Sequence, residues 1–165
     1  MDLYTELLQL IDALNSAQLD YAVCGGIAVA LYGYPRFTKD IDLLIRSEDL
    51  QRVSKTVEQH GFVDSAGAIS FDRGGPKERV VHRISKIEHA EILTLDLLLV
   101  SPALEDVWQQ REVFQWQGRQ LQLVSAEGLA KMKRLAGRDQ DLLDLKKLGF
   151  ADEQEGNQND ESEGD

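Results

Sequence analysis

The amino-acid sequence predicts an α+β fold, in which a mixed β-sheet is flanked by helices and followed by a C-terminal pair of helices. Three observations support this prediction. Leucine and isoleucine recur at helical spacing over residues 3–14. Residues 92–100 form a short, nearly unbroken apolar run, which is typical of a central strand buried on both faces. Residues 113–116 and 121–124 flank a Gln-Gly-Arg-Gln turn, which predicts a β-hairpin.

The first half of the chain is predicted to alternate helices and strands. The expected elements are a helix over residues 3–14, a strand over 21–24, a helix over 27–32, a strand at 40–43 and a helix from 47 to 61. Gly25 and Gly26 mark the first strand-to-helix turn, because glycine permits tight backbone conformations. Ser47, followed by two acids, favours a helix start, and Gly61 favours the end of that helix.

The second half is predicted to add strands and to end in helices. The expected elements are strands within 62–86 joined by a turn at 73–76, a strand over 92–100, a helix opened at 101–102, a hairpin over 113–124, and two late helices. In the first late helix, Leu129, Met132 and Ala136 recur at helical spacing and define an apolar stripe. Lys133 borders this stripe, whereas Lys131 lies far round the polar side.

Length and composition indicate one domain, residues 1–150, followed by a short tail. The chain has 165 residues, of which 42% are hydrophobic, which is enough for one core. The single cysteine, Cys24, excludes an internal disulfide and fits a reducing compartment. No segment approaches the roughly 20 apolar residues of a membrane span, and residues 1–14 lack the basic residues of a signal peptide. We therefore expect a cytoplasmic protein without membrane contact.

Negative charge is concentrated at the C-terminus. Residues 151–165 contain seven acids and no base, so they hold seven of the eleven net negative charges. This composition predicts a disordered acidic tail. Improved solubility is the simplest role for such a tail, and the alternatives are shielding a basic patch, engaging a basic partner or tethering a structural protein. The remaining residues are also acidic overall, which argues against extensive nonspecific nucleic-acid binding.

A pair of carboxylates gives the main signal for chemistry. Asp40 and Asp42 are separated by one apolar residue, so in a strand both side chains project to the same face. Two like charges held close together are unfavourable unless a cation lies between them, and carboxylate oxygens suit Mg2+ or Mn2+. The alternative interpretation is a strand end with two solvated aspartates.

A third carboxylate, Asp96, lies near the middle of the apolar run 92–100. Burying an unpaired carboxylate there would cost at least several kcal/mol. Asp96 should therefore be protonated, pair with an arginine such as Arg83, or face a cation. Together with Asp40 and Asp42, it would supply the third carboxylate of a two-metal site.

These residues resemble the nucleotidyltransferase superfamily whose fold is typified by the palm of DNA polymerase beta. Its motif is a glycine pair at a helix start, an acidic-apolar-acidic triplet on a strand, and a third acid on a neighbouring strand. The matching residues are Gly25-Gly26, Asp40-Ile41-Asp42 and Asp96. With Arg36 and Thr38 before the triplet, the chain looks most like the small bacterial nucleotidyltransferases that include abortive-infection and toxin–antitoxin toxins. The resemblance spans roughly residues 20–148.

The resemblance implies a nucleotidyltransferase core that moves a nucleoside monophosphate from a triphosphate such as ATP, with Mg2+ or Mn2+ as cofactor. Asp40, Asp42 and Asp96 would be the catalytic metal ligands. The implied nucleotide-binding residues are Gly25, Gly26, Arg36, Thr38, Lys133 and Asp141. Lys133 would reach the triphosphate, its alternative being a lysine at the edge of the core. Asp141 is a minor candidate, because pairing with Arg138 is its simpler role.

The resemblance leaves the acceptor of the nucleotide open. A tRNA end, a protein hydroxyl and a small molecule such as an aminoglycoside are the alternatives, and a toxin with a partner antitoxin is the favoured version. The competing interpretation is a catalytically inactive binding protein with the same fold, because Gly26 replaces the serine that many family members carry. Retention of all three carboxylates favours the enzyme.

Overall fold

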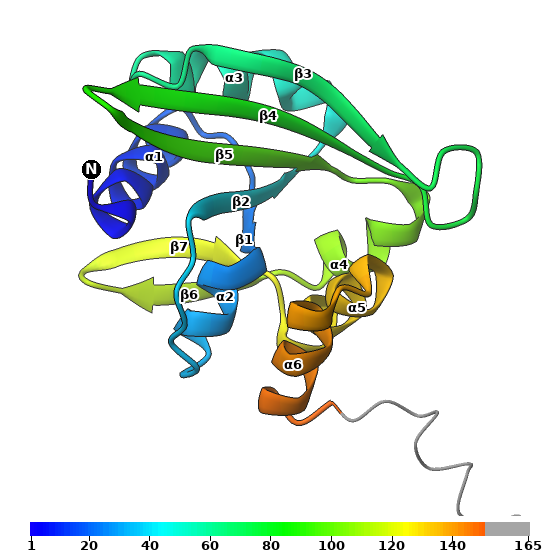
Figure 1. Cartoon of the computed structure of the whole chain (residues 1–165). Helices are drawn as coiled ribbons and strands as arrows, with labels where there is room; N and C mark the ends of the chain where they lie inside the picture. The colour runs from blue at the N-terminus through cyan, green and yellow to red at the C-terminus, as the bar shows by residue number, and fades with distance from the viewer. Residues whose placement is uncertain (151–165) are drawn as a thin grey trace, which may run out of the picture.

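The structure, a computed structural model, describes residues 1–150, which form a mixed seven-stranded sheet with helices packed against it (Figure 1). The strands are β1 (Ala22–Cys24), β2 (Asp40–Ile45), β3 (Asp64–Phe71), β4 (Arg79–Glu88), β5 (Glu91–Leu99), β6 (Glu112–Trp116) and β7 (Arg119–Leu123). The helices are α1 (Leu3–Ser16), α2 (Gly25–Leu31), α3 (Leu50–Glu58), α4 (Glu105–Gln109), α5 (Ala126–Ala136) and α6 (Asp139–Lys147). Short 3-10 turns, Ser47–Asp49 and Pro102–Leu104, lead into α3 and α4. The α+β fold expected from the sequence is confirmed.

The order of the strands in space differs from their order in the chain. Across the sheet the order is β3-β4-β5-β2-β1-β7-β6. β2 runs parallel to β5 and β1 runs parallel to β7, whereas all other neighbouring strands in this sheet are antiparallel. The strand that carries Asp40 and Asp42 therefore lies at the centre of the sheet, directly beside the strand that carries Asp96.

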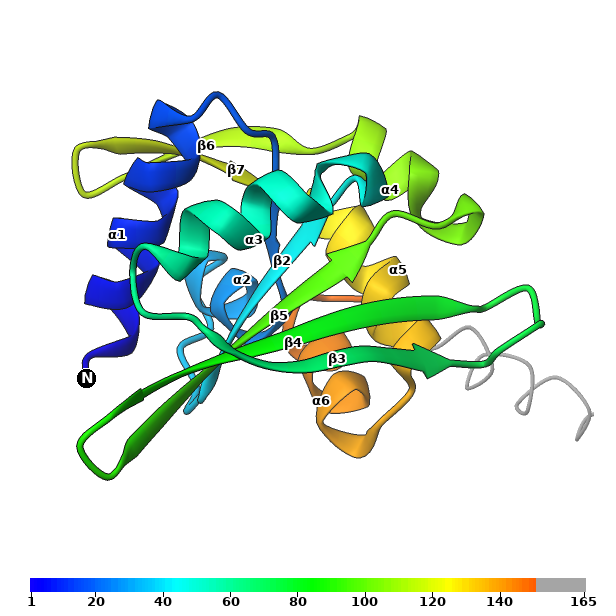
Figure 2. The same ribbon diagram turned by 90° about the horizontal axis from the view of Figure 1, so that it is seen from above.

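Because side chains alternate along β2, one face of this strand is apolar and the other carries the aspartates. Ile41 and Leu43 are fully buried, and Asp40 and Asp42 project to the opposite face. Figures 1 and 2 show α1 and α3 on one side of the sheet and α2, α5 and α6 on the other. Residues of α5 line a pocket together with Asp42. The C-terminal helical pair therefore covers the face that carries the aspartates.

A sharp turn separates the two helices of that pair. Ser125 caps the start of α5, because its hydroxyl accepts a hydrogen bond from the Gly128 N–H. Gly137 ends α5 in the left-handed conformation, with φ of +63°. At the start of α6, the Asp141 carboxylate accepts a hydrogen bond from the Arg138 N–H. The turn brings the first residues of α6 back beside the end of α5.

The expected hairpin is present as β6 and β7, and the expected opening helix is α1. Within residues 1–150, no helix combines the length and the apolar character that crossing a membrane requires. The predicted acidic tail, residues 151–165, lies outside the described residues, so the domain boundary at residue 150 stays a prediction.

Candidate active site

Strand register aligns the predicted carboxylates on one face of the sheet. Cys24 of β1 lies opposite Asp42 of β2, and on the other side of β2 the register places Asp96 of β5 beside Asp42. Beyond β5, Arg83 of β4 lies opposite Asp96. Residues in register project to the same face of a sheet. Asp40 belongs to that face as well, because it lies two residues before Asp42.

The Asp42 carboxylate lies against the backbone of Gly25, the first residue of α2. A β-carbon at Gly25 would be 2.1 Å from the Asp42 Oδ2 atom. Gly25 also has a φ of +66°, a left-handed conformation that glycine adopts readily and other residues rarely adopt. The glycine and the aspartate of the sequence motif are therefore parts of one packing arrangement.

The carboxylates of β2 carry negative charge that the protein does not balance with an ion pair. In residues 1–150, no Lys or Arg side chain pairs with Asp40 or Asp42. Burial, followed by the charges of Asp96 and Asp40, raises the pKa of Asp42 to about 7. Burial and the Asp96 charge also raise the pKa of Asp40. A bound cation would relieve this unfavourable arrangement.

Asp96 is held by Arg83 through two hydrogen bonds. The Arg83 Nε donates to Oδ1 at 2.9 Å, and Nη2 donates to Oδ2 at 3.0 Å. The sequence left three states open for a carboxylate buried at this position, and the structure has the pair with arginine. The hydrogen bonds to Asp96 raise the pKa of Arg83. Each Asp96 oxygen keeps a further lone pair beside its bond from Arg83, so a cation could share this carboxylate with the arginine.

The carboxylate set fits a divalent cation that is shared with substrate oxygens, rather than a complete protein cage. In the part of the chain that the structure describes, no group of three or more His, Cys, Asp or Glu side chains could hold a metal ion. Two carboxylates on a rigid strand are nevertheless the protein ligands that Mg2+ commonly uses together with substrate phosphates. Asp40 and Asp42 fit this role, and Asp96 as a third ligand stays a prediction.

Arg36 and Thr38 pack over Gly26, the second glycine of the pair. A β-carbon at Gly26 would lie 2.8 Å from the Thr38 Oγ1 atom and 3.0 Å from Arg36 Nη2. Arg36 also forms an ion pair with Asp144 of α6 at 3.2 Å. A serine at position 26 would require both side chains to move, which gives a physical reason for glycine here. The predicted nucleotide-binding roles of Arg36 and Thr38 stay predictions.

Lys133, predicted to reach the triphosphate, lies in a buried network of ion pairs. Its Nζ atom lies 3.1 Å from Asp141 Oδ1 and 3.1 Å from Asp144 Oδ2, and only 5% of the residue is exposed. Asp141 also accepts a hydrogen bond from Arg138 Nε at 2.9 Å. Burial pushes the pKa of Asp141 up, but the bonds from Arg138 and Lys133 outweigh it and lower that pKa. The Lys133 charge is therefore already balanced within the fold.

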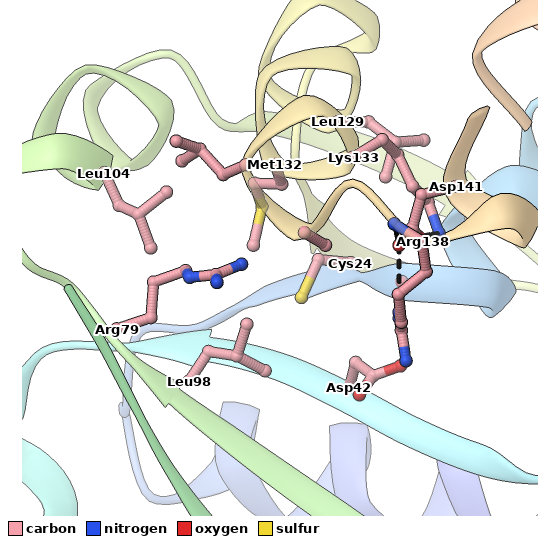
Figure 3. A pocket seen from close by; sticks show the side chains of 13 residues that line it. Cys24, Asp42, Arg79, Leu98, Leu104, Leu129, Met132, Lys133, Arg138 and Asp141 are labelled. Carbon is pink, nitrogen blue, oxygen red and sulfur yellow. Dashed lines mark hydrogen bonds and ion pairs between the residues drawn. The ribbon is translucent and has the colours of Figure 1, made fainter. Parts of the chain in front are cut away.

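Two adjoining pockets meet at Asp42. The first lies between α5 and the sheet and includes Gly25 and Lys133 in its lining (Figure 3). The second lies over β3, β4 and β5 and includes Asp96. Arg138 lines both pockets. Its side chain is 78% exposed, and Figure 3 shows it directed toward Asp42. Arg138 is thus an accessible cation of the site.

Arg79 also lines both pockets, and the sequence motif gave no indication of it. The one signal in the sequence is alternation: Arg79 and Arg83 are four residues apart, so they share a face of a strand. That signal becomes informative only when β4 is known to pair with β5. The site therefore contains arginines that no local pattern marks as functional.

Comparisons with solved structures show a shared fold. A protein of Thermotoga maritima, solved as a candidate nucleotidyltransferase, is 18% identical, with 87% of this chain and 91% of that chain covered and a TM-score of 0.60. ANT(2″)-Ia, solved in complex with adenylyl-2″-tobramycin, is 17% identical, with 87% of this chain and 85% of that chain covered and a TM-score of 0.56. No curated protein sequence matches the chain.

The sequence itself matches a family model over most of its length. The model is described as "Uncharacterised nucleotidyltransferase", and it matches residues 1–131, which include Gly25, Asp42 and Asp96. The match thus includes the strands that align the carboxylates. The chain belongs to this nucleotidyltransferase family, and it is accordingly a transferase with a nucleotide as substrate.

Proposed function

We propose that the protein transfers a nucleoside monophosphate from a nucleoside triphosphate to a hydroxyl group, with Mg2+ or Mn2+ as cofactor. The observation that carries this proposal is the pair Asp40 and Asp42, two carboxylates on one face of β2 that have no cationic partner in residues 1–150. Asp42 lines a pocket that also contains Gly25 and Arg138. Carboxylates beside an exposed arginine suit a ligand that combines phosphate with a divalent cation.

Each residue of the site has a distinct role in this proposal. Asp40 and Asp42 would hold the divalent cation, which supplies charge stabilisation at the α-phosphate when bound. Gly25 has no side chain, so the Asp42 carboxylate can lie against the start of α2. Arg138 would donate to phosphate oxygens from the guanidinium nitrogens that its bond to Asp141 does not use. Lys133 would support this arrangement from within the fold.

The transfer requires one bond to form and one to break at the α-phosphorus. The acceptor oxygen bonds to the phosphorus, the bond to the oxygen bridging to the β-phosphate breaks, and pyrophosphate leaves in line. We assign removal of the acceptor proton to Asp96, which lies beside Asp42 in register. The two hydrogen bonds from Arg83 would hold its carboxylate in a fixed orientation. The proton then passes from Asp96 to solvent.

The acceptor is proposed only as a hydroxyl-bearing molecule. ANT(2″)-Ia, which shares the fold, was solved with the adenylylated product adenylyl-2″-tobramycin. The resemblance of the motif to bacterial toxins supports a tRNA end or a protein hydroxyl as an alternative to a small molecule. We favour a toxin whose activity is restrained by an antitoxin protein, acting in the cytoplasm.

Label transfer tests the proposal directly. The full chain would be incubated with each α-labelled nucleoside triphosphate, Mg2+, and either total RNA or cell lysate, in parallel with the variant Asp42→Asn. We expect label in RNA, protein or a small molecule with the unaltered chain, and none with the variant. Equal labelling by both proteins would contradict the assignment of Asp42.

One observation favours the alternative of a catalytically inactive binding protein: Arg83 already neutralises Asp96. Such a protein would bind a triphosphate with Mg2+ but release no pyrophosphate. Calorimetry combined with a pyrophosphate assay separates the two functions. Binding without pyrophosphate release, with RNA, lysate and aminoglycosides all present as acceptors, would support the binding protein.

A further inference from the structure

The pocket between α5 and the sheet has apolar walls. Leu98 of β5, Leu104 before α4, and Met132 and Leu135 of α5 line it. In Figure 3, Asp42 lies at one end of this pocket and Arg79 at the other. A nucleotide whose phosphates lie near Asp42 would therefore extend its base along the apolar walls toward Arg79. Apolar walls with a few fixed polar groups are typical of sites for flat ring ligands.

Arg79 has donors that the protein leaves unused. Its Nη2 atom donates to the Asp72 carboxylate at 2.9 Å. Its Nε atom is buried and has no hydrogen-bond partner in residues 1–150. Figure 3 shows the guanidinium between Met132 and Leu98, directed into the pocket. A buried donor without an acceptor is uncommon in folded proteins, and it is explained when a ligand supplies the acceptor.

We propose that Arg79 selects the base of the nucleotide, and that the selected base is guanine. This inference rests on the proposed function, because it assumes that a triphosphate binds at Asp42. An arginine side chain has donors and no acceptor. Guanine presents two acceptors, O6 and N7, in the spacing that an arginine fork fits. Adenine presents a 6-amino donor in place of O6, so one arginine donor would face another donor.

The carboxylates that line the pocket would not contact the edge of guanine that carries the 2-amino group. The acids that line the pocket are Asp42 and Asp141. Asp141 is bound by Lys133 and Arg138, and Asp42 lies at the opposite end from Arg79. No carboxylate of the lining is thus free to accept from the 2-amino group of guanine. Hypoxanthine, which has O6 and N7 but no 2-amino group, should therefore be accepted as well as guanine.

Binding of four triphosphates tests this inference. Dissociation constants would be measured by calorimetry with the full chain, Mg2+ and the α,β-methylene analogues of GTP, ITP, ATP and 2,6-diaminopurine triphosphate. We expect GTP and ITP to bind alike, and the two 6-amino bases to bind about 10- to 100-fold more weakly. In the Arg79→Met variant, the dissociation constants of all four triphosphates should be similar. Arg79→Lys should remove most of the preference, because lysine lacks the fork.

Arg119→Met is the matched control. Arg119 forms an ion pair with Asp12 at 2.9 Å, as Arg79 does with Asp72, but it does not line the pocket. This variant should keep the preference for GTP. Preference for GTP that survives in Arg79→Met, equal binding of all four bases, or tighter binding of the two 6-amino bases would each overturn the inference and leave the proposed function standing. The base series on the unaltered chain decides the question if Arg79→Met does not fold. Absence of any triphosphate binding by the folded chain would overturn the proposed function as well.

Discussion

Asp40 and Asp42 on β2 differ from Asp141 and Asp144 on α6 in the way their charge is balanced. The α6 pair is bound inside the protein, since Lys133 lies 3.1 Å from both carboxylates. The β2 pair has no cationic partner in residues 1–150, and the pKa of Asp42 is raised to about 7 by burial and by the neighbouring carboxylates Asp96 and Asp40.

This difference separates the acids that stabilise the fold from the acids that we propose to bind a ligand. A buried ion pair contributes to the fold only while both partners are present. Carboxylates that the fold holds together with raised pKa values have an energetic cost, which a cation from outside would offset. The α6 acids therefore stabilise the helical pair, and the β2 acids are available for a ligand. The following experiments test this division.

Asp42→Asn should have the largest effect. It should lower activity without lowering stability. It removes one carboxylate with little change in shape, so nucleotidyl transfer should fall by roughly 1,000-fold or more, since charge stabilisation by a metal contributes several kcal/mol and each 1.4 kcal/mol is tenfold in rate. The melting temperature of the metal-free protein should be unchanged or higher, because one repulsive charge is removed. A pyrophosphate assay and a melting curve check both parts. Unfolding of the variant would make Asp42 structural.

Lys133→Met should mainly affect stability. It leaves Asp141 and Asp144 buried without their shared cation, so the free energy of unfolding should fall by about 3–5 kcal/mol. Lys131→Met is the control on the same helix, because the Lys131 pair with Asp106 is exposed and should contribute less than about 1 kcal/mol. Urea denaturation measures both variants. A Lys133→Met protein of normal stability that binds triphosphate weakly would support the role predicted from the sequence.

The two sets of acids should also change the free energy of unfolding in opposite directions as pH rises. The pKa of Asp42 is raised in the folded state from 3.8 to about 7, so the folded protein binds more protons than the unfolded chain between these values. Its free energy of unfolding should fall as pH rises from about 4 to 7, on the order of 1–3 kcal/mol from this group. The pKa of Asp141 is lowered, so its contribution is present at neutral pH and lost in acid.

Denaturation of the metal-free protein at several pH values, with Asp42→Asn in parallel, measures this response. The decline between about pH 4 and 7 should be smaller in the variant, in which Asp40 keeps a raised pKa, and the loss of stability in acid should remain. Adding Mg2+ and a nonhydrolysable triphosphate should reduce the decline in the unaltered chain. An identical pH dependence in both proteins would mean that Asp42 does not titrate as its surroundings indicate.

Arg83→Met should give the smallest effect. Arg83 is the one internal cation paired with Asp40, Asp42 or Asp96 in residues 1–150, and its charge opposes an external cation beside Asp96. Its removal should tighten Mn2+ binding by up to about fivefold, because a nearby positive charge opposes a cation by roughly 1 kcal/mol in a solvated site. Titration with Mn2+ measures this change. Weaker Mn2+ binding would indicate that Arg83 orients Asp96 for the cation.

Local patterns in the sequence predicted correctly that Asp40 and Asp42 share one face of β2. Alternation in a strand placed Asp40 and Asp42 on one side, and the glycine pair marked the turn that Asp42 packs against. A lone acid in an apolar run singled out Asp96. These inferences need only neighbours within a few residues, which is why they agree with the strands and turns observed.

The partners of these acids could not be chosen in the same way. Pairing of Asp96 with Arg83 was one of three alternatives, and the register of β4 on β5 decided it. The helical pattern placed Lys133 at the edge of the apolar stripe, but the packing of α6 on α5 buries it between two aspartates. Arg79 reaches the pocket from a strand that is distant in sequence from Asp42.

The order and type of the elements, the carboxylate pair with its glycine turn and membership of a nucleotidyltransferase family follow from the amino-acid sequence alone. Packing of strands and helices was needed to show which charges are balanced inside the protein and which carboxylates have no cationic partner in residues 1–150. Ion pairing and desolvation depend on distance and burial in space. Lys133 and Asp144 lie 3.1 Å apart because two helices pack together, and spacing along the chain carries no measure of that distance.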